Sequence, residues 1–253
     1  MSPHPAPLTA VIPTLNEANQ IADCVRTVTW ADEVIVADGG SSDETPRAAA
    51  AAGAKVLQGS WSTIAAQRNA AIAAARNQWV LAVDADERVG TDLAEEIGAT
   101  VRAPAHRAYA VRRANQYAGR MIRYGGWGDD WVVRLFQRDR RYVERRVHEH
   151  LERGTDVGRL RAPLVHTPYR DLSHYLEKLD RYATWGAAEM AERGRRAHLT
   201  DIVLRPPVRF FSMYVLRLGL LDGWRGAVLS GLAAMSVFLK YVRLWELQHK
   251  GDG

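Results

Sequence analysis

The first hundred residues alternate between short apolar runs and longer helix-favouring stretches. The apolar runs are of strand length and fall at 8–12, 33–37, 55–58 and 78–83. The stretches between them favour helices, through apolar residues at helical spacing or through abundant alanine, over about 17–29, 46–52 and 63–75. Strands that alternate with helices through short loops are typical of a parallel sheet covered on both faces. The pattern therefore predicts an α/β fold with a mostly parallel, Rossmann-like sheet.

Three of these apolar runs end in polar residues. The first stops at 13–17, where Asn16 is a suitable N-cap for the next helix; the second ends in Asp38, and the fourth in Asp84, Ala85 and Asp86. The carboxyl ends of parallel strands share one edge of a sheet, which is where such folds bind ligands. Asp84 and Asp86 could bind Mg²⁺ or Mn²⁺ there, or could be solvated acids at a strand end.

The second half of the chain has a different texture. A helix is expected at 91–101, strands at 108–113 and 132–137, and a further helix at 174–192. Arginine and aromatic residues are dense here, and Arg134 is one of several that could meet acceptor phosphates or lie solvated at a strand edge. We predict a catalytic α/β domain over residues 1–168 and a helical region over 169–253.

Two apolar segments near the C-terminus, 205–216 and 226–239, are flanked by arginine and lysine. The second is uncharged for fourteen residues, whereas a membrane-spanning helix needs about 20 apolar residues. Both segments fit an anchor that lies in the surface of an anionic cytoplasmic leaflet. The alternatives are packing against the catalytic domain or against a second subunit in a homodimer.

Charge and cysteine content narrow the setting. The chain has a net charge of +5, but residues 1–105 carry seven Lys and Arg against thirteen Asp and Glu, so the second half is strongly basic. That asymmetry suggests an anionic partner: nucleic acid, an anionic membrane or a phosphorylated acceptor. Cys24 is the single cysteine, which excludes an internal disulfide. With no signal-peptide pattern at the N-terminus, a reducing cytoplasm is expected.

Four stretches carry a resemblance to a known family. They are Val-Ile-Pro-Thr-Leu-Asn-Glu at 11–17, Val-Ala-Asp-Gly-Gly-Ser-Ser-Asp-Glu-Thr at 36–45, Ala-Gln-Arg-Asn at 66–69 and Asp-Ala-Asp-Glu at 84–87. In this order they resemble the motifs of family 2 inverting glycosyltransferases with the GT-A fold, over roughly the first 150 residues. More narrowly, the chain resembles the bacterial lipopolysaccharide core β-1,4-glucosyltransferase group.

The resemblance implies a binding site for a nucleotide-sugar donor. Pro13 and Glu17 would line the nucleotide, with Glu17 accepting hydrogen bonds from ribose hydroxyls. Asp38 would accept a hydrogen bond from the imide N–H of uracil. Arg68 would approach the nucleotide or its phosphates; the alternative from the residues alone is a surface arginine beside an acid.

The same resemblance implies a metal site and a catalytic base. Asp86 would ligate Mn²⁺ or Mg²⁺, with His148 completing the metal shell, while Asp84, next to Ala85 in the donor motif, would hold the ribose or a metal-bound water. An inverting transfer also needs a base that deprotonates the acceptor hydroxyl. Glu149 is the first candidate and Asp130 the second.

The sequence therefore predicts a metal-dependent inverting glycosyltransferase whose donor is a nucleoside diphosphate sugar, with UDP expected as the nucleotide. Its acceptor would be a lipopolysaccharide core or a lipid-linked glycan, not a nucleic acid, and it would lie at the inner face of the cytoplasmic membrane. A sugar nucleotidyltransferase is one alternative, although its glycine-rich cationic first loop is replaced by residues 13–17. A noncatalytic nucleotide-sugar-binding or scaffold protein is the other. A calcium loop starting at Asp84 is excluded by Arg88 and Val89.

Overall fold

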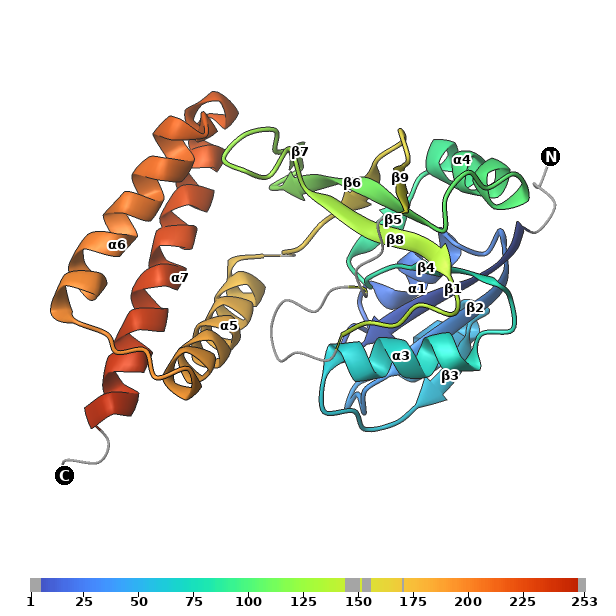
Figure 1. Cartoon of the computed structure of the whole chain (residues 1–253), viewed down its shortest axis with the longest axis horizontal. Coiled ribbons are helices and arrows are strands. Elements are labelled where there is room, and N and C mark those ends of the chain that lie inside the picture. Colours follow the sequence, from blue (N-terminus) through green and yellow to red (C-terminus); the bar gives the residue numbers. More distant parts are fainter. Residues whose placement is uncertain (1–5, 144–150, 152–155, 170, 250–253) are drawn as a thin grey trace. The chain divides into compact units, whose positions relative to one another are not determined.

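The computed structural model describes residues 6–143, 151, 156–169 and 171–249. The chain divides into two compact units. The sheet unit comprises residues up to 114 together with 130–166, and the helical unit comprises 115–129 together with the residues from 167 onward. Figure 1 labels the elements of both.

A mixed sheet forms the centre of the sheet unit. Four parallel strands lie in the order β3 (Lys55–Gln58), β2 (Ala31–Asp38), β1 (Ala6–Thr14) and β4 (Trp79–Ala82). The sheet continues through β8 (Trp131–Gln137), antiparallel to β4, and β6 (Ala108–Tyr117), antiparallel to β8, and then through β10 (Leu164–His166) to β5 (Glu87–Val89). Strand β9 (Val157–Arg159) pairs with β6. The expected α/β class with a mostly parallel first half is confirmed.

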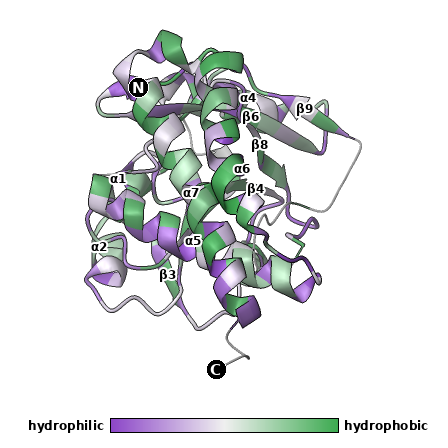
Figure 2. Cartoon of the chain, turned by 90° about the vertical axis from the view of Figure 1, so that its left-hand side faces the viewer, coloured by the Kyte–Doolittle hydropathy of each residue, from purple (hydrophilic) through white to green (hydrophobic). Residues whose placement is uncertain are grey.

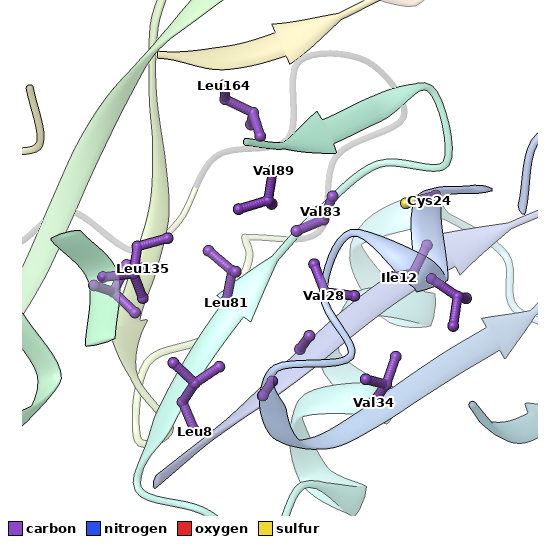
Figure 3. Packing of buried hydrophobic residues seen from close by; sticks show 14 of the residues in the cluster. Leu8, Ile12, Cys24, Val28, Val34, Leu81, Val83, Val89, Leu135 and Leu164 are labelled. Atoms are coloured by element: carbon purple, nitrogen blue, oxygen red, sulfur yellow. The ribbon is translucent and has the colours of Figure 1, made fainter. Parts of the chain in front are cut away.

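Helices cover both faces of this sheet. They are α1 (Ile21–Arg26), α2 (Thr45–Ala51), α3 (Ile64–Ala74) and α4 (Thr91–Arg102). Because side chains alternate along a strand, Ile12 of β1 packs with α1, α2 and α4 while Val11 packs with α3 on the other face. Figure 3 shows part of the first of these cores, to which Leu8, Leu81, Val83, Val28 and Cys24 all belong.

The first loop differs from the sequence prediction. Helix α1 begins at Ile21 instead of Glu17; in the turn before it, the carbonyl of Glu17 accepts hydrogen bonds from the N–H groups of Gln20 and Ile21. Asn16 has a φ of 55° and is not the N-cap, so that expectation was wrong. Its side-chain oxygen accepts instead from the N–H of Ser42, 2.9 Å away.

The helical unit is built on three long helices. They are α5 (Leu172–Glu192), α6 (Leu199–Phe211) and α7 (Trp224–His249). Helix α7 packs against the other two around a small core of Ala187, Tyr241 and Leu244. A π-helical turn, η1 (Ser212–Leu216), and a 3₁₀ turn, η2 (Gly219–Asp222), connect α6 to α7, and β7 (Arg120–Met121) pairs with the end of β6.

The sequence underestimated the length of the last helix. Helix α7 runs unbroken for 26 residues and includes Arg225, Lys240 and Arg243, which border the uncharged stretch or follow it. By length and composition it could cross a membrane, and it meets this criterion alone among the helices that the structure describes. A core helix of a soluble protein can meet the same criterion, so length does not assign a membrane span.

Candidate functional site

The polar ends of three neighbouring strands meet at one edge of the sheet. Strand β1 lies between β2 and β4, so the loop after Thr14, Asp38 and the segment after Ala82 are adjacent. The expectation that these strand ends converge is confirmed. An edge of this kind, at the carboxyl ends of parallel strands, is where open α/β sheets bind nucleotides.

Asp38 shapes the loop that follows it. Its side chain is buried and accepts hydrogen bonds from the N–H groups of Gly40 and Ser41, at 3.2 and 3.0 Å, and from the Ser41 hydroxyl at 2.5 Å. Gly40 has a φ of 90°, which glycine adopts without a steric penalty. The carboxylate is thus held in place at the edge of the site. A nucleobase that donates a hydrogen bond to Asp38 would bind an oxygen that already accepts from this loop.

The first loop is tied to the second. The N–H of Glu17 donates to the hydroxyl of Thr45 at 2.8 Å, and the Glu17 carboxylate accepts from the side chain of Gln20 at 2.6 Å. Pro13 is buried inside β1, in register with Ala37. Glu17 is half-buried at the loop and therefore better placed than Pro13 to meet a ligand.

The stretch 67–69 on α3 connects the strand ends. Gln67 donates to the carbonyls of Thr14 and Ala37, at 2.9 and 2.7 Å. Arg68 donates to Asp84 at 2.5 Å and lies over the ring of Tyr142, 4.9 Å from its centroid. Asn69 exchanges two hydrogen bonds with the backbone of Tyr142. Gln67 therefore holds the ends of β1 and β2, Arg68 holds Asp84, and Asn69 holds the backbone at Tyr142.

Asp84 is held by two arginines. One carboxylate oxygen accepts from Arg68 and the other from Arg134. Burial alone would raise the pKa of Asp84, but the charges of Arg134 and Arg68 outweigh it and hold that pKa well below its usual range. Asp84 is ionised and engaged on both oxygens, so its first role is to fix the arginines at the edge of the site.

Glu87 extends this ion pair into a chain of charges that is buried at Arg68, Arg134 and Glu87. The side chain of Glu87 is fully buried; it accepts from Arg134 at 2.6 Å and from the N–H of Asp84 at 2.9 Å. Arg113 lies 3.8 Å from Glu87 and donates to Asp130 at 2.8 Å. Arg68, Asp84, Arg134, Glu87, Arg113 and Asp130 thus alternate in charge from α3 to the start of β8. Alternation offsets the cost of burying so many charges.

Asp86 points to a different partner. Its Oδ1 atom lies 3.5 Å from Nε2 of His166, and both side chains are largely buried. Two ligands of one Mg²⁺ or Mn²⁺ lie about 2.0–2.2 Å from the ion and hence about 3 Å apart, so this pair could share a cation. In the described part of the chain no three His, Cys, Asp or Glu residues are grouped as a complete metal site. The remaining ligands would be water and substrate phosphate oxygens, as is usual for Mg²⁺.

Ala85 separates the two acids. Its side chain is buried in the core, and its carbonyl accepts from Arg88 at 2.8 Å. Arg88 also donates to the carbonyl of Gln20, 3.1 Å away, which ties the turn to the first loop. The turn is thereby fixed with Asp84 towards the arginines and Asp86 towards His166.

Two of the candidates named from sequence, His148 and Glu149, lie outside the described residues. Asp130 lies at the start of β8, bound to Arg113 through its side chain and its carbonyl. Their roles remain predictions.

Sequence reasoning missed four residues of the site. It gave no role to Glu87, although it named the motif at 84–87, it left out Arg113 and His166, and it assigned Arg134 to the acceptor side or to solvent. Glu87 had a usable signal, since a third acid directly after Asp86 at the end of an apolar run is unusual unless it is paired. The other three are brought to the edge by β6, β8 and β10, whose pairing the sequence does not specify.

The fold and this edge define a class. Residues 9–161 match the family model described as Glycosyl transferase family 2, and the chain belongs to that family. Its mixed α/β sheet is consistent with the GT-A fold of that family.

Two relatives and one solved structure are similar to parts or most of this chain. A lipopolysaccharide core biosynthesis glycosyltransferase, LpsC, from Rhizobium meliloti is 26% identical over 258 residues, covering 93% of either chain. A TPR repeat-containing protein from Synechococcus elongatus is 32% identical over 193 residues; these cover 74% of this chain but 46% of the relative, so the chain spans about half of that protein. Glucosyl-3-phosphoglycerate synthase from Mycobacterium tuberculosis, crystallised with Mn²⁺ and UDP, is 22% identical with a TM-score of 0.37, covering 43% of this chain and 44% of the other. That likeness covers less than half of either chain and does not bear on substrates.

Proposed function

We propose that this glycosyltransferase is metal-dependent and inverting, and that it moves a sugar, a hexose, from a UDP-linked donor to a lipopolysaccharide-core or lipid-linked acceptor. The observation that carries the metal dependence is the pair of Asp86 and His166 beside the ion-paired Asp84. With both oxygens of Asp84 held by arginines, Asp86 is the acid of the motif that is placed to bind a cation.

In this proposal the three strand ends bind the donor. Glu17 accepts from the ribose hydroxyls, and Asp38 accepts from the imide N–H of the base. Arg68 and Arg134 keep Asp84 fixed at the edge where the diphosphate would bind. A divalent cation at Asp86 and His166 would supply the charge that stabilises the departing nucleoside diphosphate.

Inversion requires a single displacement at the anomeric carbon. The acceptor hydroxyl attacks from the side opposite the diphosphate, and a carboxylate takes its proton. We assign this base to Glu149. Asp130 is the second candidate, and its hydrogen bonds from Arg113 favour a structural role for it because an arginine partner weakens a carboxylate as a base.

The proposed acceptor and the proposed cellular location are supported by a relative and not by the geometry of the site. LpsC, whose name places it in lipopolysaccharide core biosynthesis, covers 93% of either chain, so the helical unit is part of the likeness. We propose that the protein works in the cytoplasm at the inner face of the membrane, where lipid-borne acceptors would be presented.

A donor and acceptor screen tests the assignment. The protein would be incubated with Mn²⁺, a panel of nucleotide sugars and either truncated lipopolysaccharide cores or lipid-linked sugars, and products would be identified by mass spectrometry. NMR of the product should show an anomeric configuration opposite to that of the donor. A product that retains the donor configuration would contradict an inverting enzyme.

A further inference from the structure

The outward side of α6 is apolar. None of its thirteen residues is buried. Ile202 packs against the core of the helical unit, whereas Leu199, Val203, Leu204, Val208 and Phe211 are between 53% and 69% exposed. With 3.6 residues per turn, their positions fall within one half of the helix circumference. In a helix whose outer side faces water, this side would be polar.

The turns between α6 and α7 continue this surface. Leu216, Leu218, Leu220, Leu221 and Trp224 are between 41% and 68% exposed. We call these residues, with the five exposed apolar residues of α6, the hairpin face. Figure 2 shows the long hydrophobic stretches of α6 and α7.

The corner of the hairpin face is rigidly built. The carboxylate of Asp222 accepts from the N–H groups of Arg123 and Tyr124, and the N–H of Gly125 donates to the carbonyl of Arg217 at 2.8 Å. A Cβ on Gly226 would lie 1.8 Å from the carbonyl oxygen of Gly219, so η2 and α7 approach closely. The exposed leucines are therefore held outward by a fixed backbone.

Basic residues outnumber acids in the part of the chain that carries this face. Between residues 193 and 249 there are nine arginines and lysines against three acids. Of these acids, Asp201 pairs with Arg205, and Asp222 is engaged in the corner. Arg195, Arg196, Arg209 and Arg217 are exposed. Apolar side chains bordered by arginines complement the phosphates and acyl chains of an anionic lipid surface.

We propose that the hairpin face docks on an anionic phospholipid bilayer, with its apolar side chains in the boundary between headgroups and acyl chains and its arginines on lipid phosphates. This inference rests on the membrane-peripheral location proposed above and assigns the surface responsible. At about 1.5 Å per residue, α6 is about 20 Å long, too short to cross a hydrocarbon core of about 30 Å. The helix therefore lies in the plane of the surface.

A second copy of this chain fits the face less well. A two-fold contact would bring together two copies of the same arginine-rich surface, with few acids nearby to pair with the arginines. A lipid surface brings the opposite charge and needs no shape complementarity.

Vesicle flotation tests the face. Wild-type protein should float with vesicles of phosphatidylcholine and phosphatidylglycerol, at least about tenfold more than with phosphatidylcholine alone, and raised salt should weaken this. The double variant Val208→Glu with Leu216→Glu should lose binding about tenfold or more. Leu172 is an apolar residue of α5 that is 55% exposed and lies outside the hairpin face. Leu172→Glu is therefore the matched control and should bind vesicles as the wild type does.

A label provides a test that does not depend on the folding of the charged variants. Cys24 is fully buried, so a polarity-sensitive dye would react with Leu216→Cys or, as control, Leu172→Cys. Anionic vesicles should shift the emission at 216 towards the blue and leave that at 172 unchanged. No shift at 216, or equal shifts at both positions, would overturn the proposal.

Two further outcomes keep the inference separate from the proposed function. Release of nucleotide from the donor, assayed without lipid, should persist in the flotation variants. If wild-type protein hydrolyses the donor but does not float, only the proposal that the hairpin face docks on a bilayer is overturned. If it floats but does not hydrolyse any donor, the docking proposal stands and the proposed enzymatic function is contradicted. If the wild-type protein does not float, but forms a dimer without lipid that Leu216→Glu dissociates, then the hairpin face binds a second copy of the chain and the bilayer proposal is overturned.

Discussion

Nη2 of Arg134 lies 2.6 Å from Oε1 of Glu87, and both side chains are buried. The same Nη2 atom donates to Asp84. A single arginine on β8 thus fixes two acids of the turn after β4. The geometry of the donor motif therefore depends on the antiparallel strand beside it.

Removing the charge of Glu87 should destabilise the sheet unit. In Glu87→Gln the amide cannot accept from both Arg134 and the N–H of Asp84, so a buried positive charge loses one partner. We expect a loss of roughly 3 kcal/mol in the free energy of unfolding, measured by urea denaturation. Asp139→Asn removes an exposed partner of Arg107 and should cost less than about 0.5 kcal/mol. Equal effects of the two would contradict a buried network.

The pair of Asp86 and His166 should determine metal affinity. Asp86→Asn and His166→Asn each remove one ligand, and we expect Mn²⁺ binding in the presence of UDP to weaken about tenfold or more in calorimetry. His106, which lies 2.6 Å from Asp156 at the surface, offers a matched histidine and acid pair. His106→Asn should leave the affinity unchanged; a loss there equal to that of His166→Asn would argue against the site.

The parallel strands and the converging acids could be predicted because they are local. The second and fourth apolar runs end at Asp38 and Asp84, and helix-favouring stretches follow the first three runs at short intervals. The partners of those acids could not be predicted. Arg134 and His166 reach the edge on strands that are far in sequence from the acids and that pair antiparallel with the neighbouring strands. The failed N-cap at Asn16 has a related cause: its side chain is used by Ser42 of another loop.

The two candidate bases should separate by kinetics. Glu149→Gln removes the proton acceptor, and we expect the rate of transfer to fall by roughly 10²–10⁴-fold with little change in donor KM. Asp130→Asn should act mainly through Arg113 and lower stability more than transfer. If Glu149→Gln transfers at the wild-type rate while Asp130→Asn does not, the base is Asp130.

Tyr175 gives a pH dependence in the helical unit. Burial raises the pKa of its phenol to about 12 from an ordinary value near 10, and its ring lies 4.1 Å from that of Tyr169. A raised pKa in the folded state means that this contribution to stability is intact below about pH 10 and is lost as the pH rises towards 12. Over that range wild-type protein should lose about 2–3 kcal/mol more than Tyr175→Phe, as followed by circular dichroism. Parallel pH profiles would contradict the assignment.

The most direct test of the account is the release of UDP from UDP-sugars by the purified wild-type chain, with and without Mn²⁺. We expect release with Mn²⁺, its loss with a chelator and its recovery when the metal is restored, and little release by folded Asp86→Asn under any of these conditions. Release by Asp86→Asn at the wild-type rate, or none from any candidate donor by folded wild-type protein, would contradict the metal-dependent site.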